Sequence, residues 1–492
     1  MKRKSSVSLV LMIIITMATQ VLTLMKSSVV ASIFGATAEL DAFNLANNIV
    51  SFLFGLVAAG VSTIIIPEYT GKKNHKAVNT FITVVYAVVF AVISMMIFFR
   101  IQLIDAVSNR DELFVYTAGS LLSVLLLAQT LASVANITVA YFQCEGFYNI
   151  PKIISFFSHL LVITLLYCAK WYNKDISVMQ YTMIVAAGLV FNFVIDTAVA
   201  LKKGWRYKPS FTFGLETVDL FKRFLPIIPS TGVYHLSQMI DSIITARLET
   251  GRVTILSYSS QISSMVNTAI VGNLLMYIYP RIAKNIKSDD SQAMFWRQSE
   301  FIHLVVCLMV AGFVAIGKEA VLLLFHYGEF TYEASVSVFY GAAIYIFAQQ
   351  ASVVRNMIYY YFYSIGDTKT PATNGILVSI INIGVSIVLA HFIGFYGVIV
   401  GTAIAAIFSM IIMCRFKQKI GYRVNPWTII GRYFANLAIM TVTIAVVLVT
   451  KWLIPIATPL LSIAVFGVET VLLYVVAQLV LNRKVIMAYR LL

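Results

Sequence analysis

Charged side chains are scarce in this chain. Only 12% of its 492 residues are Asp, Glu, Lys or Arg, whereas 60% are hydrophobic. A soluble domain carries about twice that charged fraction. The mean hydropathy is +0.87, and one water-soluble core cannot hide so much apolar surface. The composition excludes an ordinary soluble enzyme or binding domain and predicts an integral membrane protein.

Acidic residues are scarcer than basic ones. The chain has 21 Asp and Glu and 36 Lys and Arg, which gives a net charge of +15. In a soluble protein that excess would suggest nucleic acid as a partner. Here the basic residues concentrate in alternate connections between apolar runs, for example Lys72-Lys73 and Lys202-Lys203. This is the positive-inside pattern of a multi-pass protein, so nucleic acid is not implied. It predicts a bacterial inner-membrane protein with both termini in the cytoplasm.

Motifs for cofactor or metal chemistry are also missing. There is no Gly-x4-Gly-Lys-Ser/Thr phosphate-binding loop and no His-Glu-x-x-His pair. The four cysteines lack metal-ligand spacing and suggest no disulfide framework; they are Cys144, Cys168, Cys307 and Cys414. We therefore expect no cofactor, no metal and no enzymatic activity, and the sequence leaves a coupling ion unknown.

Long apolar runs fill the chain, and they predict about fourteen transmembrane helices. We expect these at residues 7–35, 41–67, 77–99, 113–142, 152–169, 178–201, 219–248, 253–279, 299–324, 333–363, 372–391, 395–414, 429–450 and 457–481. The fold class is an all-α integral membrane protein. The N-terminal Met1-Lys-Arg-Lys and its long apolar run indicate a signal anchor that is not cleaved.

An internal repeat divides the predicted helices into two sets. The passage from Tyr141 to Pro151 matches the passage from Tyr361 to Pro371, and both share a Gly-x4-Pro turn. Each half holds six spans, which is typical of transporters built from parallel repeats around a central site. We predict an N-terminal lobe at 1–208, a C-terminal lobe at 209–424 and two extra helices at 425–492.

Polar side chains within the spans are the candidate binding residues, because burying them in a membrane is costly. Eight candidates follow the polar faces of the first, second, seventh, eighth and tenth spans: Gln20, Lys26, Asp41, Asn48, Gln238, Asp241, Gln261 and Arg355. The alternative is that such residues hold helices together by hydrogen bonds, which is the usual role of Ser, Thr and Asn in membranes. Both interpretations stay open at this stage.

Six passages of the chain match a known family in sequence: Ala31–Phe43, Gly60–Tyr69, Asp241–Ile244, Tyr279–Arg281, Leu324–Thr331 and Phe362–Pro371. They resemble the MurJ (MviN-type) lipid II flippase family of the wider multidrug, oligosaccharidyl-lipid and polysaccharide flippase superfamily. The last of these is similar to the family's Phe-Tyr-Ala-x-Gly-Asp-Thr-x-Thr-Pro turn. The resemblance covers most of residues 20–415 in the same order.

The resemblance implies two six-helix lobes around a cavity, alternating access, and a polyprenyl-diphosphate sugar as substrate in peptidoglycan synthesis. It places Lys26 at the family's basic position in the first helix and Asp41 at its acidic one. Gln20, Phe54 and Gln261 stand where typical members carry arginine. Fewer cationic positions make another lipid-linked oligosaccharide, for a capsule or exopolysaccharide, a serious option beside lipid II.

We therefore predict a flippase of an undecaprenyl-diphosphate-linked saccharide, with membrane lipids and a glycan polymerase as possible partners. Lys26 would attract the diphosphate, and Asp241 would balance charge or couple to a cation. The amides of Asn48, Gln261, Gln20 and Gln238 would bind sugar hydroxyls. Three alternatives are a cation-coupled multidrug or metabolite antiporter, a membrane-embedded glycan polymerase or glycosyltransferase, and a scaffold without transport activity.

Overall fold

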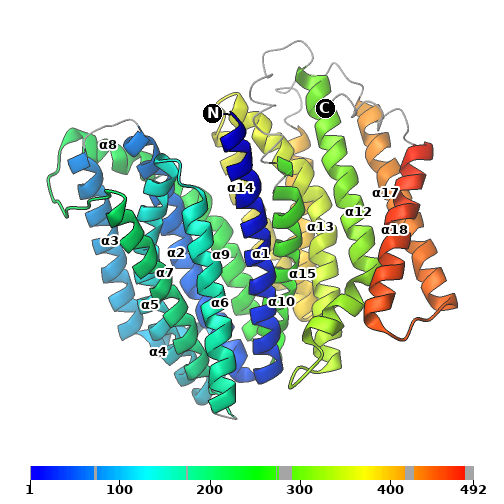
Figure 1. The fold of residues 1–492 in the computed structure, drawn as a ribbon, viewed down its shortest axis with the longest axis horizontal. Helices are drawn as coiled ribbons and strands as arrows, with labels where there is room; N and C mark the ends of the chain where they lie inside the picture. The colour runs from blue at the N-terminus through cyan, green and yellow to red at the C-terminus, as the bar shows by residue number, and fades with distance from the viewer. Residues whose placement is uncertain are drawn as a thin grey trace. The chain divides into compact units, whose positions relative to one another are not determined.

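All regular structure in the described residues is helical. The computed structural model describes residues 2–70, 75–172, 175–225, 227–272, 274–275, 291–415 and 426–481, and Figure 1 shows their helices running side by side within each half of the chain. A helix satisfies its backbone hydrogen bonds internally, which apolar segments in lipid require. The prediction of an all-helical membrane fold is confirmed.

The chain folds as two compact units, Met1–Thr254 and Ile255–Leu492. The helices of the first unit are α1 (Lys2–Phe34), α2 (Ala38–Thr70), α3 (His75–Phe98), α4 (Arg100–Ser108), α5 (Glu112–Cys144), α6 (Asn149–Tyr172), α7 (Val178–Lys202), α8 (Leu215–Phe224) and α9 (Ile227–Ala246). The first turn of α10 (Arg252–Val266) completes this unit.

The second unit contains the rest of α10 and the helices that follow it. These are η1 (Asn267–Gly272), α12 (Ser291–Phe325), α13 (Tyr332–Ser364), α14 (Lys369–Ile393), α15 (Phe395–Arg415), α17 (Pro426–Leu453) and α18 (Pro459–Leu481). The unit boundary places α9 with the first unit, whereas the sequence repeat assigns the same helix to the C-terminal lobe. The lobe boundaries predicted from the repeat stay a prediction.

Twelve helices of the described residues are long and apolar enough to cross a membrane. The seventh predicted span, 219–248, is divided between α8 and α9. Pro226 stands between the two helices in the sequence and Pro229 in the first turn of α9, and proline is tolerated at the start of a helix but disrupts its interior. The eighth, 253–279, begins as α10 and continues as the π-helical η1, while its last residues lie outside the described part. The other predicted spans agree with helices of the structure.

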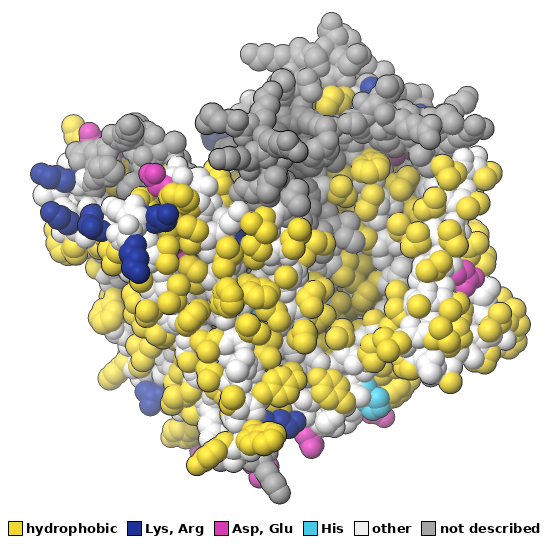
Figure 2. Space-filling model, viewed as in Figure 1, with side chains coloured by type: hydrophobic (Ala, Val, Ile, Leu, Met, Phe, Trp, Pro, Cys, Tyr) yellow, Lys and Arg dark blue, Asp and Glu magenta, His cyan; other side chains and the backbone are white. Residues whose placement is uncertain are grey.

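The short helix α8 packs one face against α3. Phe81 of α3 contacts Phe221 and Phe224, with ring centroids 5.0 and 5.4 Å apart. Leu215 and Val218 of α8 remain exposed. Exposed basic side chains lie on α8 and in the segment of the chain before it: Lys202, Lys203, Arg206, Lys208, Lys222 and Arg223. Figure 2 shows Lys and Arg gathered at this end of the first unit, beyond a mostly hydrophobic surface.

Both copies of the repeated turn have the same hydrogen bonds. The backbone N–H of Phe147 donates to the carbonyl of Phe142 at 2.7 Å, and 220 residues later Asp367 donates to Phe362 at 3.0 Å. The glycine of each turn has a positive φ, 78° at Gly146 and 82° at Gly366. This geometry is the Schellman ending of a helix. The predicted Gly-x4-Pro turn is confirmed in both halves.

The C-terminal helix α17 is attached to α12 by two charged contacts, and α18 by a hydrogen bond between them. Arg432 of α17 donates to Glu300 of α12 at 3.1 Å. Farther along the same two helices, Lys451 lies 2.7 Å from Glu319. Between these pairs the hydroxyl of Tyr474 on α18 donates to the carbonyl of Leu304 at 2.9 Å. The extra helices therefore form one packed body with α12.

Candidate functional site

Two residues of α2 and two of α9 lie where these helices meet, and we call this line of contact the α2–α9 seam. They are Asn48 and Gly55 of α2, and His235 and Ser242 of α9. The side-chain amide of Asn48 donates to the hydroxyl of Ser242 at 2.7 Å. About two turns farther along α2, a Cβ added to Gly55 would lie only 2.7 Å from Nε2 of His235. Small and hydrogen-bonding side chains here let the two helices approach closely. Asn48 thus holds helices together in this structure.

Asp41 has a defined structural task, because its carboxylate caps the first turn of α10. Oδ2 accepts from the backbone N–H of Gly251 at 2.6 Å, and Oδ1 accepts from the N–H and the hydroxyl of Thr254, both at 2.8 Å. Gly251 precedes the helix and has no side chain to serve as its cap. Asp41 is fully buried and supplies the missing acceptor from α2.

Two arginines hold the connection between α9 and α10 from its other side. The guanidinium of Arg110 donates to the carbonyls of Ala246 and Leu248, each at 2.7 Å, at the end of α9. In return Arg247 donates to the carbonyl of Val107 at 2.9 Å, at the end of α4. Each cation binds carbonyls that a helix end leaves without partners and also complements the negative end of the helix dipole. The segment between α3 and α5 therefore contains a helix, α4, with a bonding role.

Replacing Arg110 with alanine is expected to destabilise the protein by about 2–3 kcal/mol, because two carbonyls lose charged donors. Arg110→Lys should recover only part of this loss, since an ammonium cannot donate in the forked geometry of a guanidinium. Thermal unfolding of the purified variants measures the difference. Equal melting temperatures for Arg110→Ala and the unaltered protein would contradict the capping role.

Gly251 is a second position where a small change has a large expected effect. Its φ is 85°, and a Cβ there would lie 2.6 Å from the carbonyl oxygen of Ala36. Gly251→Ala should therefore cost the left-handed strain of about 1–2 kcal/mol and a backbone shift in addition. Gly146→Ala is the matched control, because its φ is also positive but its surroundings are open. Denaturation should rank Gly251→Ala clearly below Gly146→Ala.

Lys26 and Gln20 lie on α1, and both side chains are half-buried. Lys26 is close enough to His159 of α6 for its charge to act on that imidazole. Sequence reasoning missed His159, although a histidine within an apolar span is itself an uncommon signal. Lys26 thus lies about two turns before the end of α1 at Phe34, beside the imidazole of His159.

The remaining predicted residues lie on three helices. On α9, Gln238 is exposed and Asp241 is buried with 6% exposure. In the second unit, Gln261 is half-buried on α10. Arg355 on α13 donates to Oδ1 of the adjacent Asn356 at 3.1 Å and lies over the Tyr359 ring. Substrate contact by each of these residues stays a prediction.

The first unit brings Asp41 and Asn48 onto one side of α2, where both take part in contacts with the segment from α9 to the start of α10. Lys26 and Gln20 lie on α1, which packs against α6. Within the described residues, no three His, Cys, Asp or Glu side chains gather where they could hold a metal ion. The candidate set is therefore two groups within the first unit, with Gln261 and Arg355 in the second.

Comparison with known proteins gives a consistent family. The family model described as lipid II flippase MurJ matches residues 30–471. The probable lipid II flippase MurJ of Borreliella burgdorferi is 24% identical over 445 residues, covering 86% of this chain and 85% of the relative. That of Rickettsia prowazekii is 23% identical over 430 residues, covering 83% of each chain.

Solved structures share the fold. A structure of lipid II flippase MurJ in an inward closed conformation covers 97% of this chain and 100% of its own, with a TM-score of 0.83 and 16% identity. An inward-facing MATE multidrug transporter of the MOP superfamily reaches a TM-score of 0.68 over 82% of this chain and 94% of its own, at 15% identity. Because the family model matches nearly the whole chain, this protein belongs to the MurJ lipid II flippase family.

Proposed function

We propose that this protein carries an undecaprenyl-diphosphate-linked saccharide from the cytoplasmic to the outer leaflet of a bacterial inner membrane by alternating access. Membership of the MurJ family, with a match over residues 30–471, is the observation that carries this proposal. Lipid II is the first substrate to test, and a related surface-glycan precursor is the second. Enzymatic activity is not part of the proposed role.

The polar residues of α1 fit an anionic headgroup. Lys26 supplies a positive charge at membrane depth, and His159 beside it adds a hydrogen-bonding ring. In our proposal the diphosphate approaches Lys26, while Gln20, Gln238 and Gln261 bind sugar hydroxyls. The diphosphate meets fewer fixed cations than in typical members, so sugar contacts contribute a larger share of binding.

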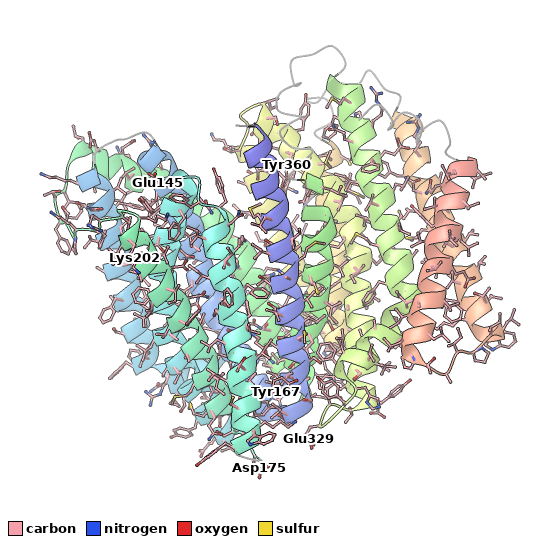
Figure 3. The ribbon with its side chains drawn as sticks, viewed as in Figure 1. Glu145, Tyr167, Asp175, Lys202, Glu329 and Tyr360 are labelled. Carbon is pink, nitrogen blue, oxygen red and sulfur yellow. The ribbon has the colours of Figure 1, made fainter. Side chains whose placement is uncertain are left out.

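The proposed orientation puts both termini in the cytoplasm. Lys202 and Glu145 lie at one end of the first unit and Asp175 at the other, as Figure 3 shows. The exposed basic side chains around α8 are at the Lys202 end, which agrees with the positive-inside rule. A glycan polymerase on the outer side would consume the delivered substrate and favour transport in one direction.

Depletion of the protein in its host, followed by mass spectrometry of polyprenyl-linked precursors, tests the function. We expect one lipid-linked glycan to accumulate on the cytoplasmic side, and its mass identifies the headgroup. An unchanged precursor profile together with new sensitivity to cationic drugs would refute the flippase and favour the antiporter. Family membership already favours the flippase over that alternative.

A further inference from the structure

Three polar atoms near one end of α7 are buried without any hydrogen-bond partner. They are Oδ1 of Asn192, Oδ1 of Asp196 and Oγ1 of Thr197. Asp196 is only 5% exposed and lies on the packed face of its helix. Elsewhere on α7, the hydroxyl of Thr182 follows the usual pattern and donates to the carbonyl of Val178 at 2.8 Å. Thr197 does not, and as the residue next to Asp196 it lies on a different side of the helix.

The chemistry of Asn192 and Asp196 shows what this face of α7 lacks. A carboxylate oxygen and an amide oxygen only accept hydrogen bonds, and Asn192 and Asp196 are neighbours at i and i+4 on the helix. Two acceptors side by side need a donor or a cation. A buried water molecule would supply donors, but it would leave the negative charge of Asp196 uncompensated inside a membrane-spanning helix. An isolated buried carboxylate is too costly to persist in that form.

Among the side chains that the structure describes, the neighbouring helices offer no counter-charge. α7 packs against α2, α5 and α6. The titratable groups of the described parts of α5 and α6 at this end are engaged or face outward: the Tyr141 hydroxyl donates to the carbonyl of Lys203 at 2.9 Å, and Lys152 is exposed. His159 lies toward Lys26, and Asp41 of α2 is committed to the start of α10. Lys202, on α7 itself, is exposed.

We propose that Asp196, with Asn192 on the same face of α7, forms a binding site for a small monovalent cation, either a proton or Na⁺. With a proton, Asp196 becomes a neutral acid whose O–H donates to Oδ1 of Asn192. With Na⁺, the oxygens of Asp196 and Asn192 serve as ligands, which are of the hard oxygen type that such cations prefer. Either cation neutralises the buried negative charge of Asp196.

The position of the site suits exchange with the compartment at the Lys202 end. Asp196 precedes Lys202 by six residues, or about 9 Å along the helix. Figure 3 shows Lys202 at the basic end of the first unit, which we propose faces the cytoplasm. If the proposed transport function holds, a cation bound here would link the conformation of the first unit to the ion gradient.

Labelling with dicyclohexylcarbodiimide tests the site in the purified full-length protein, independently of transport. This apolar reagent modifies protonated carboxyl groups in membrane segments, and peptide mass spectrometry locates the modified residue. We expect labelling of Asp196 that decreases at least about tenfold from acid to alkaline pH, as expected for a group that exchanges a proton. Asp41 is the internal control and should not be labelled, because three donors occupy its carboxylate.

Added salts distinguish the two cations. Protection by NaCl but not by KCl identifies Na⁺, and equal labelling in both salts identifies a proton. Asp196→Asn should remove the label and also abolish any dependence of the melting temperature on pH or Na⁺, while keeping the fold. Absence of label together with a melting temperature insensitive to both ions overturns the proposal. So does labelling that is constant across pH and salt, since such a carboxyl exchanges nothing.

Discussion

Replacing Asp41 with alanine is expected to destabilise the protein by about 2–6 kcal/mol, the largest loss of stability among the substitutions considered. The variant leaves the N–H groups of Gly251 and Thr254 buried without acceptors, and each such group costs about 1–3 kcal/mol. It also removes the charge that favours the positive end of the α10 dipole. Hydrogen exchange measured by mass spectrometry should show faster exchange at residues 251–254, and thermal unfolding should give the global loss.

Two control variants separate capping from charge. Asp41→Asn keeps one acceptor oxygen, so it should lie between the unaltered protein and Asp41→Ala. Glu39→Gln removes a negative charge from the exposed first turn of the same helix and should change the melting temperature little. If Asp41→Ala unfolds at the temperature of the unaltered protein, Asp41 does not act as a cap and its role as a substrate ligand regains weight.

Lys26→Ala should reduce transport by roughly 10- to 100-fold, because a charged contact to the diphosphate contributes about 1.5–3 kcal/mol. The rate at which a lipid-linked precursor reaches the outer leaflet of proteoliposomes measures this effect. Lys26→Arg keeps the charge and should recover most of the activity. Protein yield and melting temperature should stay near normal, since Lys26 makes no described hydrogen bond on which the fold depends.

A lysine outside the candidate site provides the comparison. Lys170 is exposed at the end of α6, so Lys170→Ala should transport at the unaltered rate. His159→Gln tests the neighbour of Lys26 and is expected to weaken transport less, because a neutral hydrogen-bonding group remains. Normal transport by well-expressed Lys26→Ala would rule out the assigned role of Lys26 while leaving the flippase function itself open to the depletion experiment.

The sequence was sufficient for the architecture and insufficient for the local bonding. Apolar runs and the positive-inside asymmetry predict each span without knowledge of the helices packed against it. Most predicted spans therefore agree with helices of the structure. The division of 219–248 was signalled by Pro226 and Pro229 but masked by the apolar residues on both sides. Hydropathy averaged over a window cannot separate an amphipathic helix from the span that follows it.

The cap formed by Asp41 could not be predicted from the sequence because its partners lie 210 residues away. One local signal was present: α10 begins after Gly251, a residue without a capping side chain, so another part of the chain had to supply an acceptor. Similarly, Asn48 and Asp196 look alike as polar residues in apolar spans. Only packing reveals that Asn48 has a partner on α9 and that Oδ1 of Asp196 has none.

The two ion pairs between α12 and α17 lie a fixed distance apart along the helix axes. Glu300 and Glu319 are 19 residues apart (319 − 300), and so are Arg432 and Lys451 (451 − 432). At a rise of about 1.5 Å per residue, both helices place their charges about 28 Å apart, close to the roughly 30 Å of a bilayer's hydrocarbon core. Ion pairs at both ends oppose sliding of α12 along α17. In a thinner or thicker membrane this pair of helices would tilt together or deform the lipid around it.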